Sequence, residues 1–180
     1  MRDEKGFSLI ELIVTVALMA VLMTGVFIGL GALTGMHARE CANDLDTALD
    51  QAKNYALTKS GGLDAYMELG KDTDGYYVAF YVPDKPVVKP GETATYLLVD
   101  RKKVGNASVT ITCNFKGGAS VAVADSPVRF YYDRVSGAFK EAEYGVGLSD
   151  FCTEIRVEKN RLYVFTHIPA TGKHILERVS

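Results

Sequence analysis

The sequence predicts an α+β protein in which a long N-terminal helix packs on a mostly antiparallel β-sheet. An apolar run near the N-terminus leads into residues that recur at helical spacing, up to about residue 60. From residue 61 onward, short alternating apolar segments are separated by Gly, Pro, Asn and Asp, as strands are by turns. A helix followed by a series of strands is typical of the α+β class.

The apolar run covers residues 12–36 and contains no ionisable side chain. Eighteen of its 25 residues are Ala, Val, Ile, Leu, Met or Phe. As a helix it would extend about 37 Å, which is enough to cross a hydrocarbon core of about 30 Å. We therefore expect residues 7–36 to form a transmembrane half of the helix. A secretory signal cut near Gly31 or Gly35 and a plain signal anchor are the alternatives.

The helix is expected to continue through residues 37–60 as an amphipathic half. Cys41, Leu45, Ala48, Ala52 and Tyr55 recur at steps of four and three and form one apolar stripe. A Ser-Gly-Gly sequence from residue 60 predicts the end of the helix. Whether the helix is unbroken through the four glycines between residues 25 and 35 is left open by the sequence.

Residues 61–180 are expected to form one β-rich head, long enough to bury its own core. The alternation predicts strands at 66–69, 76–82, 96–99, 108–115 and 128–132. Near the C-terminus, a two-residue turn at Lys159-Asn160 would pair Val157 with Leu162 and Ile155 with Val164 on an apolar face.

Composition narrows the function classes. The 180 residues are 48% hydrophobic and carry a formal net charge of −2, from 20 basic and 22 acidic residues. This balance excludes a disordered polyelectrolyte and strong whole-chain attraction to nucleic acid. The sequence contains no nucleophile elbow, zinc-protease helix, P-loop or paired Cys-x-x-Cys motif, so we expect no enzyme, no metal site and no cofactor.

Glu11 lies at the edge of the apolar run, where a carboxylate costs a few kcal/mol in lipid and less near the interface. It is either a tolerated interfacial residue or one with a cationic partner. The surrounding sequence, Gly6-Phe7-Ser8-Leu9-Ile10-Glu11 after a short charged leader, resembles the prepilin signature of type IV pilins and type II secretion pseudopilins.

The resemblance implies specific processing and assembly roles. Residues 1–6 would be a leader that prepilin peptidase removes between Gly6 and Phe7, after which the Phe7 amine is N-methylated. Glu11 of one subunit would then neutralise the Phe7 ammonium of its neighbour during filament assembly, and a charge pair of this kind specifies register. The implied partners are other pilins through the N-terminal helix, the prepilin peptidase and the inner-membrane assembly platform.

The resemblance also implies a location and a fold. The chain would be a single-pass protein of the inner membrane with its head outside the cytoplasm, and would later join a pilus or pseudopilus in the envelope. The fold would be pilin-like. The distal segments at 128–132, 136–137, 161–166 and 169–173 more weakly resemble the GspH/FimT-like minor pseudopilins.

Two functions follow as expectations. The first is a structural, minor subunit of a pseudopilus or type IV-like pilus that serves protein secretion. The alternative is a DNA-binding pilin of a DNA-uptake or pilus machine, with Arg156, Lys159, Arg161 and Lys173 as the contacts; a solvated sheet face is the plainer interpretation of these residues.

Two smaller features have a structural and a chemical interpretation. In the register above, Cys152 would oppose His167 and point away from the apolar face that holds Cys113, so a Cys113–Cys152 disulfide would need the strands to meet elsewhere. A Cys–His dyad would lack a third orienting group. The Asp72-Thr73-Asp74-Gly75 sequence is expected to be a hairpin turn, with a loose calcium loop as the alternative.

Overall fold

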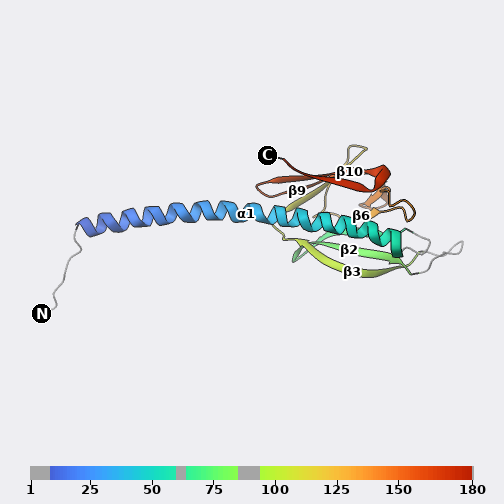
Figure 1. Ribbon diagram of the computed structural model, residues 1–180, viewed down its shortest axis with the longest axis horizontal. Helices are drawn as coiled ribbons and strands as arrows, with labels where there is room; N and C mark the ends of the chain where they lie inside the picture. The colour runs from blue at the N-terminus through green and yellow to red at the C-terminus, as the bar shows by residue number, and fades with distance from the viewer. Residues whose placement is uncertain (1–8, 60–63, 85–93, 180) are drawn as a thin grey trace.

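The computed structural model describes residues 9–59, 64–84 and 94–179, with the side chains of residues 21–35 outside the description. One helix, α1 (Leu9–Lys59), runs unbroken for 51 residues, about 76 Å at 1.5 Å per residue. Its first half projects from the head, and its second half lies between two β-sheets (Figure 1). The helix is therefore continuous through the glycine-rich stretch.

Sheet A has six strands in the order β3-β2-β1-β6-β7-β8. All of its strand pairs among the described residues are antiparallel. The strands are β1 (Tyr66–Asp72), β2 (Gly75–Pro83), β3 (Tyr96–Gly105), β6 (Val128–Tyr131), β7 (Ala142–Tyr144) and β8 (Leu148–Asp150).

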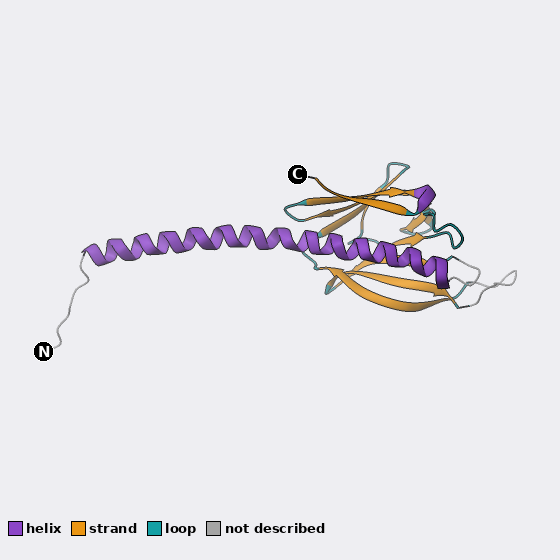
Figure 2. Cartoon of the chain, viewed as in Figure 1, coloured by secondary structure: helices purple, strands orange, loops and turns teal. Residues whose placement is uncertain are grey.

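Sheet B has five strands in the order β11-β10-β9-β4-β5, also paired antiparallel throughout the described part. The strands are β4 (Thr110–Phe115), β5 (Ser120–Ala122), β9 (Cys152–Glu158), β10 (Leu162–Ile168) and β11 (Lys173–Val179), with the short 3-10 helix η1 (Pro169–Thr171) before β11. The α+β class with antiparallel pairing is confirmed, but the head has two sheets where we expected one (Figure 2).

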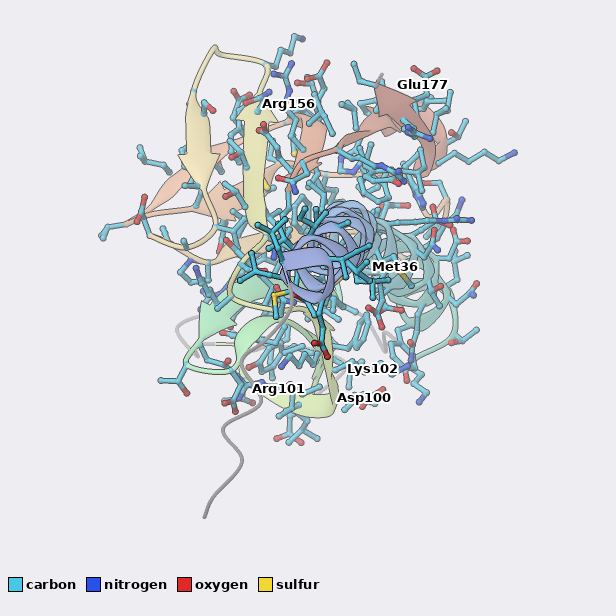
Figure 3. The ribbon with its side chains drawn as sticks, turned by 90° about the vertical axis from the view of Figure 1, so that its left-hand side faces the viewer. Met36, Asp100, Arg101, Lys102, Arg156 and Glu177 are labelled. Atoms are coloured by element: carbon cyan, nitrogen blue, oxygen red, sulfur yellow. The ribbon has the colours of Figure 1, made fainter. Side chains whose placement is uncertain are left out.

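The second half of α1 is buried because the sheets cover it on two sides. Viewed along the helix, strands of sheet A and sheet B lie on opposite sides of it (Figure 3). Its buried side chains are mostly small, which lets both sheets approach closely; they are Ala38, Cys41, Ala42, Leu45, Ala48, Leu49, Ala52 and Ala56. Two-sided packing therefore needs a wider buried surface than the single predicted stripe.

Close packing between α1 and sheet A depends on a glycine at the end of β3. A Cβ atom added to Gly105 would lie 2.7 Å from the Cys41 Sγ atom, nearer than side chains pack. The strand itself is longer than the predicted 96–99 segment, it forms one edge of sheet A, and most of its side chains are exposed.

The predicted register of the C-terminal hairpin is wrong by one residue. Val157 pairs with Tyr163 and Ile155 with Phe165, so the connection has three residues, 159–161, and not two. Asn160 adopts the left-handed conformation (φ 56°) that this longer turn requires. As a result, Tyr163 and Phe165 face the core and the predicted partners Leu162 and Val164 are only half-buried.

Candidate functional site

The projecting half of α1 presents apolar side chains to its surroundings. Between residues 9 and 19, eight large apolar side chains are at least half exposed: Leu9, Ile10, Leu12, Ile13, Val14, Val16, Leu18 and Met19. Glu11 lies among them, and the Thr15 hydroxyl binds back to the carbonyl oxygens of Glu11 and Leu12 at 3.0 and 2.9 Å. This surface is suited to burial in lipid or against other helices.

Two sequence predictions fall on residues that the structure leaves out. Gly6 and Phe7, the predicted cleavage and methylation positions, lie outside the described residues. The centre of the predicted membrane segment, residues 21–35, likewise lies outside the described side chains. Within the described residues, no helix combines the length and the apolar character needed to cross a membrane.

The packed half of α1 is tied to the head by polar contacts to both sheets. On the sheet B side, His174 Nε2 lies 2.8 Å from Asp46 Oδ1, and Lys53 Nζ donates to the Thr171 carbonyl oxygen at 2.8 Å. On the sheet A side, Lys102 Nζ donates to Gln51 Oε1 at 2.7 Å. With these contacts on both sides, the head and the helix are expected to move as one body.

The outer face of sheet A carries a cluster of tyrosines that sequence reasoning missed. Tyr66 lies opposite both Tyr81 and Tyr131 across neighbouring strands. Its ring centroid is 4.7 Å from that of Tyr81, 4.9 Å from that of Tyr96 and 5.3 Å from that of Tyr131. Alternation within β2 hints at this face, but only the register across four strands brings the rings together.

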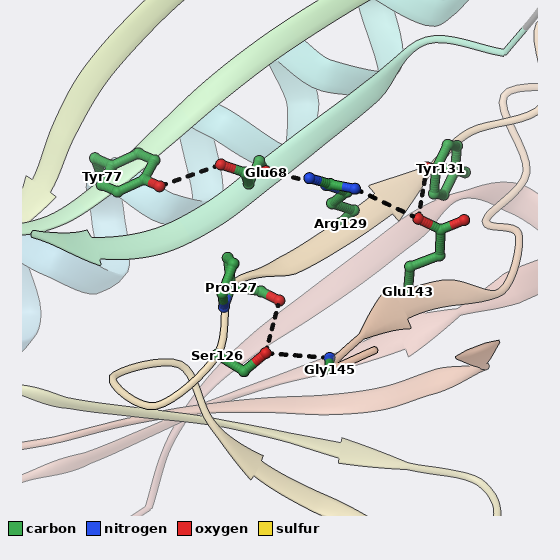
Figure 4. Close-up of polar contacts among 8 residues, drawn as sticks. All are labelled: Glu68, Tyr77, Ser126, Pro127, Arg129, Tyr131, Glu143 and Gly145. Atoms are coloured by element: carbon green, nitrogen blue, oxygen red, sulfur yellow. Dashed lines mark hydrogen bonds and ion pairs between the residues drawn. The ribbon is translucent and has the colours of Figure 1, made fainter. Parts of the chain in front are cut away.

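A polar network accompanies these tyrosines (Figure 4). Glu68 accepts hydrogen bonds from Tyr77 Oη at 3.1 Å and from Arg129 Nε at 3.0 Å. Glu143 accepts one from Tyr131 Oη at 2.9 Å and pairs with Arg129 Nη1 at 3.8 Å. Burial raises the pKa of Tyr131, and its hydrogen bond to Glu143 raises it further.

The charges of this network largely cancel. Hydrogen bonding to Glu68 raises the pKa of Arg129, so the guanidinium stays charged between two carboxylates. Arg101 lies over the Tyr77 ring, 3.9 Å from its centroid, and pairs with Asp72 at 2.7 Å. A Tyr- and Arg-rich surface with little net charge is suited to contact with another protein more than to a polyanion.

A cavity of about 450 Å³ adjoins this face beyond Tyr131. Its polar lining groups bind one another: Lys140 Nζ pairs with Asp64 at 2.6 Å, and Ser149 Oγ donates to Glu141 at 3.0 Å. The lining consists of Asp64, Tyr131, Phe139, Lys140, Glu141, Glu143, Ser149 and Phe151. The arrangement can hold a flat or apolar group against its aromatic rings.

The four residues predicted to contact DNA are only partly brought together. Arg156 pairs with Glu154 at 3.1 Å, and Lys159 donates to the Ser108 hydroxyl. Lys173 pairs with Ile168 at the far end of the β10–β11 hairpin, six residues and roughly 20 Å from the end that holds Arg161. Arg156 and Glu177 lie on either side of Val164, one strand apart from it in each direction, so acidic side chains share this part of sheet B.

The Asp72–Gly75 segment is a tight hairpin turn between β1 and β2, as predicted. Asp72 pairs with Gly75, and Asp72 Oδ1 accepts a hydrogen bond from the Asp74 amide at 2.9 Å. The other carboxylate oxygen of Asp72 holds Arg101. Both oxygens thus stabilise the turn and its neighbouring strand.

The predicted orientation of Cys152 is wrong. A register irregularity in β9 pairs Cys152 with Phe115 and Glu154 with Asn114, leaving Thr153 as the extra residue of a β-bulge. The bulge turns Cys152 to the same side as Cys113, and both side chains are buried. In the structure Cys41, Cys113 and Cys152 are free thiols.

Comparison with known proteins bears on the N-terminal segment. No curated protein and no solved structure matches the chain. Residues 1–27 match the family described as the prokaryotic N-terminal methylation motif, a segment that includes Gly6, Phe7 and Glu11. The chain therefore carries a type IV pilin-like prepilin signature, which marks a precursor processed by prepilin peptidase.

Proposed function

We propose that the chain is a minor structural subunit of a pseudopilus or type IV-like pilus that serves protein secretion, and that it is not an enzyme. The observation that carries the proposal is the projecting half of α1, where exposed apolar side chains surround Glu11 within the matched methylation motif. A helix that exposes this much apolar surface needs lipid before assembly and neighbouring helices after it.

In this proposal the chain is first held in the inner membrane by residues 7–36, with its head outside the cytoplasm. Prepilin peptidase cuts between Gly6 and Phe7, and the new Phe7 amine is methylated. Glu11 then pairs with the Phe7 ammonium of a neighbouring subunit as the helix leaves the bilayer. A charge pair in an apolar filament core has a strong geometric preference, so it sets the register between subunits.

The minor position is supported by the head. Sheet A exposes a tyrosine face next to a cavity, and such a surface suits specific contact with another subunit or with cargo. The weak resemblance of the distal segments to GspH/FimT-like pseudopilins points the same way. The helix-to-head contacts of Asp46, Gln51 and Lys53 would keep this surface at a fixed angle to the filament axis.

The testing experiment measures the mass and N-terminal residue of the full chain made with and without a prepilin peptidase. We expect a chain that begins at a methylated Phe7 only when the peptidase is present, and an uncut chain for Gly6→Val. Gly70→Ala is no suitable control because Tyr77 fills that space. Gly118→Asn is a better one, because no described atom lies within 4 Å of a Cβ there and Asn tolerates a positive φ, here 88°, better than other side chains. A chain cut beyond Gly31 would overturn the proposal.

DNA binding during uptake is the alternative, favoured by one observation. Arg161 and Arg178 both line a second cavity, separate from the one beside Tyr131. This cavity lies at the β9–β10 turn, which contains Lys159. This alternative predicts an affinity for duplex DNA that falls steeply with salt and is lost in the Lys159→Ala/Arg161→Ala double variant. Lys71→Ala/Lys103→Ala removes the same charge from sheet A and serves as the control.

A further inference from the structure

Two of the three cysteines lie together in the core of sheet B. Cys113 is fully buried in β4, and Cys152 is 5% exposed at the start of the neighbouring strand β9. The two strands are paired, with Cys113 opposite Ile155 and Cys152 opposite Phe115, so the two cysteines are diagonal neighbours on one buried face. We propose that Cys113 and Cys152 form an intrachain disulfide once the head is outside the cytoplasm, while Cys41 remains a thiol; this rests on the proposed export of the head.

The β-bulge explains why the two thiols meet. In an unbroken ladder Cys113 pairs with Ile155, and strict alternation would place Thr153, not Cys152, on the buried face. The extra residue is held by the Thr153 hydroxyl, which donates to the Asn114 carbonyl oxygen at 3.1 Å. The bulge therefore re-aims Cys152 toward Cys113 at the cost of one ladder position, and a bulge of this kind often serves to re-aim a side chain.

The surroundings of Cys152 favour its thiolate. The hydrogen bond from the Cys113 thiol lowers the pKa of Cys152, and the neighbouring His167 lowers it further, whereas burial acts in the opposite direction. His167 is itself buried, with Nδ1 3.2 Å from the Cys152 carbonyl oxygen and Nε2 without a hydrogen-bond partner among the described residues. In the folded head, Cys152 therefore lies beside both His167 and the cysteine with which it would be linked.

The oxidation needs an acceptor for two electrons, and its chemical class is a disulfide donor. The Cys152 thiolate attacks one sulfur of the donor disulfide. A mixed disulfide forms between Cys152 and that sulfur, and the other donor sulfur leaves as a thiolate. The Cys113 thiol then loses its proton and attacks the Cys152 sulfur, which releases the second donor thiolate. The chain loses two protons and two electrons, and the donor disulfide becomes two thiols. Because both cysteines are buried, this exchange takes place before sheet B is fully packed.

Cys41 is excluded from this chemistry by its position. It lies on α1 against Gly105 of sheet A, whereas the pair belongs to sheet B. Burial raises the pKa of Cys41 to about 12, and the nearby Asp44 and Glu40 carboxylates raise it as well. A thiol that stays protonated reacts slowly with disulfides.

The test uses the full chain, extracted in detergent from the membranes of cells that make it, with thiols blocked under denaturing conditions by N-ethylmaleimide. We expect one blocked cysteine per chain before reduction and three after it. A tryptic digest should contain peptide 104–116 linked to peptide 141–156, and peptide 40–53 carrying the block. Cys41→Ser should keep the link, while Cys113→Ser should leave two blockable thiols.

A second arm separates the geometry from the export on which it depends. The reduced full chain is refolded with oxidised glutathione, and the linked peptides are measured again. Linkage in both arms supports the proposal. Linkage in vitro but three free thiols in cells contradicts export of the head, and with it the proposed function. No linkage in either arm, a different pairing, or one bound zinc ion per chain overturns the assignment of the pair.

Discussion

The two halves of α1 have one continuous backbone and opposite surroundings. The half up to residue 19 that the structure describes is apolar nearly all round and exposed, whereas the half from Ala38 onward buries mostly small residues between two sheets. The first half therefore gains nothing from the head, and the second half gains most of its stability from it. The comparison assigns assembly to one half and head stability to the other.

The largest effect that would break this assignment comes from Glu11→Ala. Without the carboxylate, the Phe7 ammonium of a neighbouring subunit would be buried without its partner, which costs about 3 kcal/mol or more and lowers incorporation into filaments by about 100-fold. Incorporation is measured by quantifying the chain in sheared filaments. Head stability should not change.

Glu40→Ala is the matched control for this variant, because Glu40 is an exposed carboxylate at the start of the packed half. It should leave incorporation within about twofold of the unaltered chain, an effect below 0.5 kcal/mol, as is usual for surface positions. Equal losses for both variants would mean that charge in general, and not the position of Glu11, supports assembly.

The next effect concerns head stability. Leu45 is fully buried between the sheets, so Leu45→Ala should lower the free energy of unfolding of the head by about 3 kcal/mol, through lost apolar burial and the cavity that remains. Leu12→Ala, at a position 58% exposed, should change it by less than about 0.5 kcal/mol. Urea unfolding of the full chain in detergent, followed by tyrosine fluorescence, measures both.

Much of this contrast could be predicted from the sequence, because it depends on local periodicity. The apolar run, the switch to one-sided spacing at Cys41 and Leu45, and the change to alternation after residue 61 all lie within short windows. The methylation motif is equally local, and its match over residues 1–27 confirms the resemblance drawn from Gly6, Phe7 and Glu11.

The features that the sequence did not predict depend on single residues that change register. Asn160 adds one residue to the β9–β10 turn and thereby exchanges Leu162 for Tyr163 in the core. The bulge at Thr153 likewise brings Cys152 beside Cys113. Since side chains alternate with a period of two, each such insertion reverses the orientation of every side chain beyond it. The tyrosine face likewise depends on the pairing register between strands, which the sequence does not specify locally.

A smaller effect tests how closely the packed half of α1 approaches sheet A. Gly105→Ala would place its Cβ about 2.7 Å from Cys41 Sγ, and overpacking of this kind costs about 1–3 kcal/mol. Removing the sulfur in Cys41→Ala should relieve most of that cost, so the double variant should be about 1 kcal/mol more stable than the sum of the single changes predicts. Additive losses would show that the strand can shift away from the helix.

The smallest effect comes from one buried hydrogen bond between the packed half and the residue that follows β6. The Tyr132 hydroxyl donates to the Leu49 carbonyl oxygen at 3.2 Å, so Tyr132→Phe should cost about 1 kcal/mol in the free energy of unfolding. The cost stays low because the Leu49 carbonyl oxygen lies within α1 and still accepts its helical backbone hydrogen bond. Tyr131→Phe removes a hydroxyl that binds Glu143 on the outer face, and should cost less than half as much. If it cost as much or more, the outer tyrosine network would contribute to head stability and would be less free to serve as a contact surface.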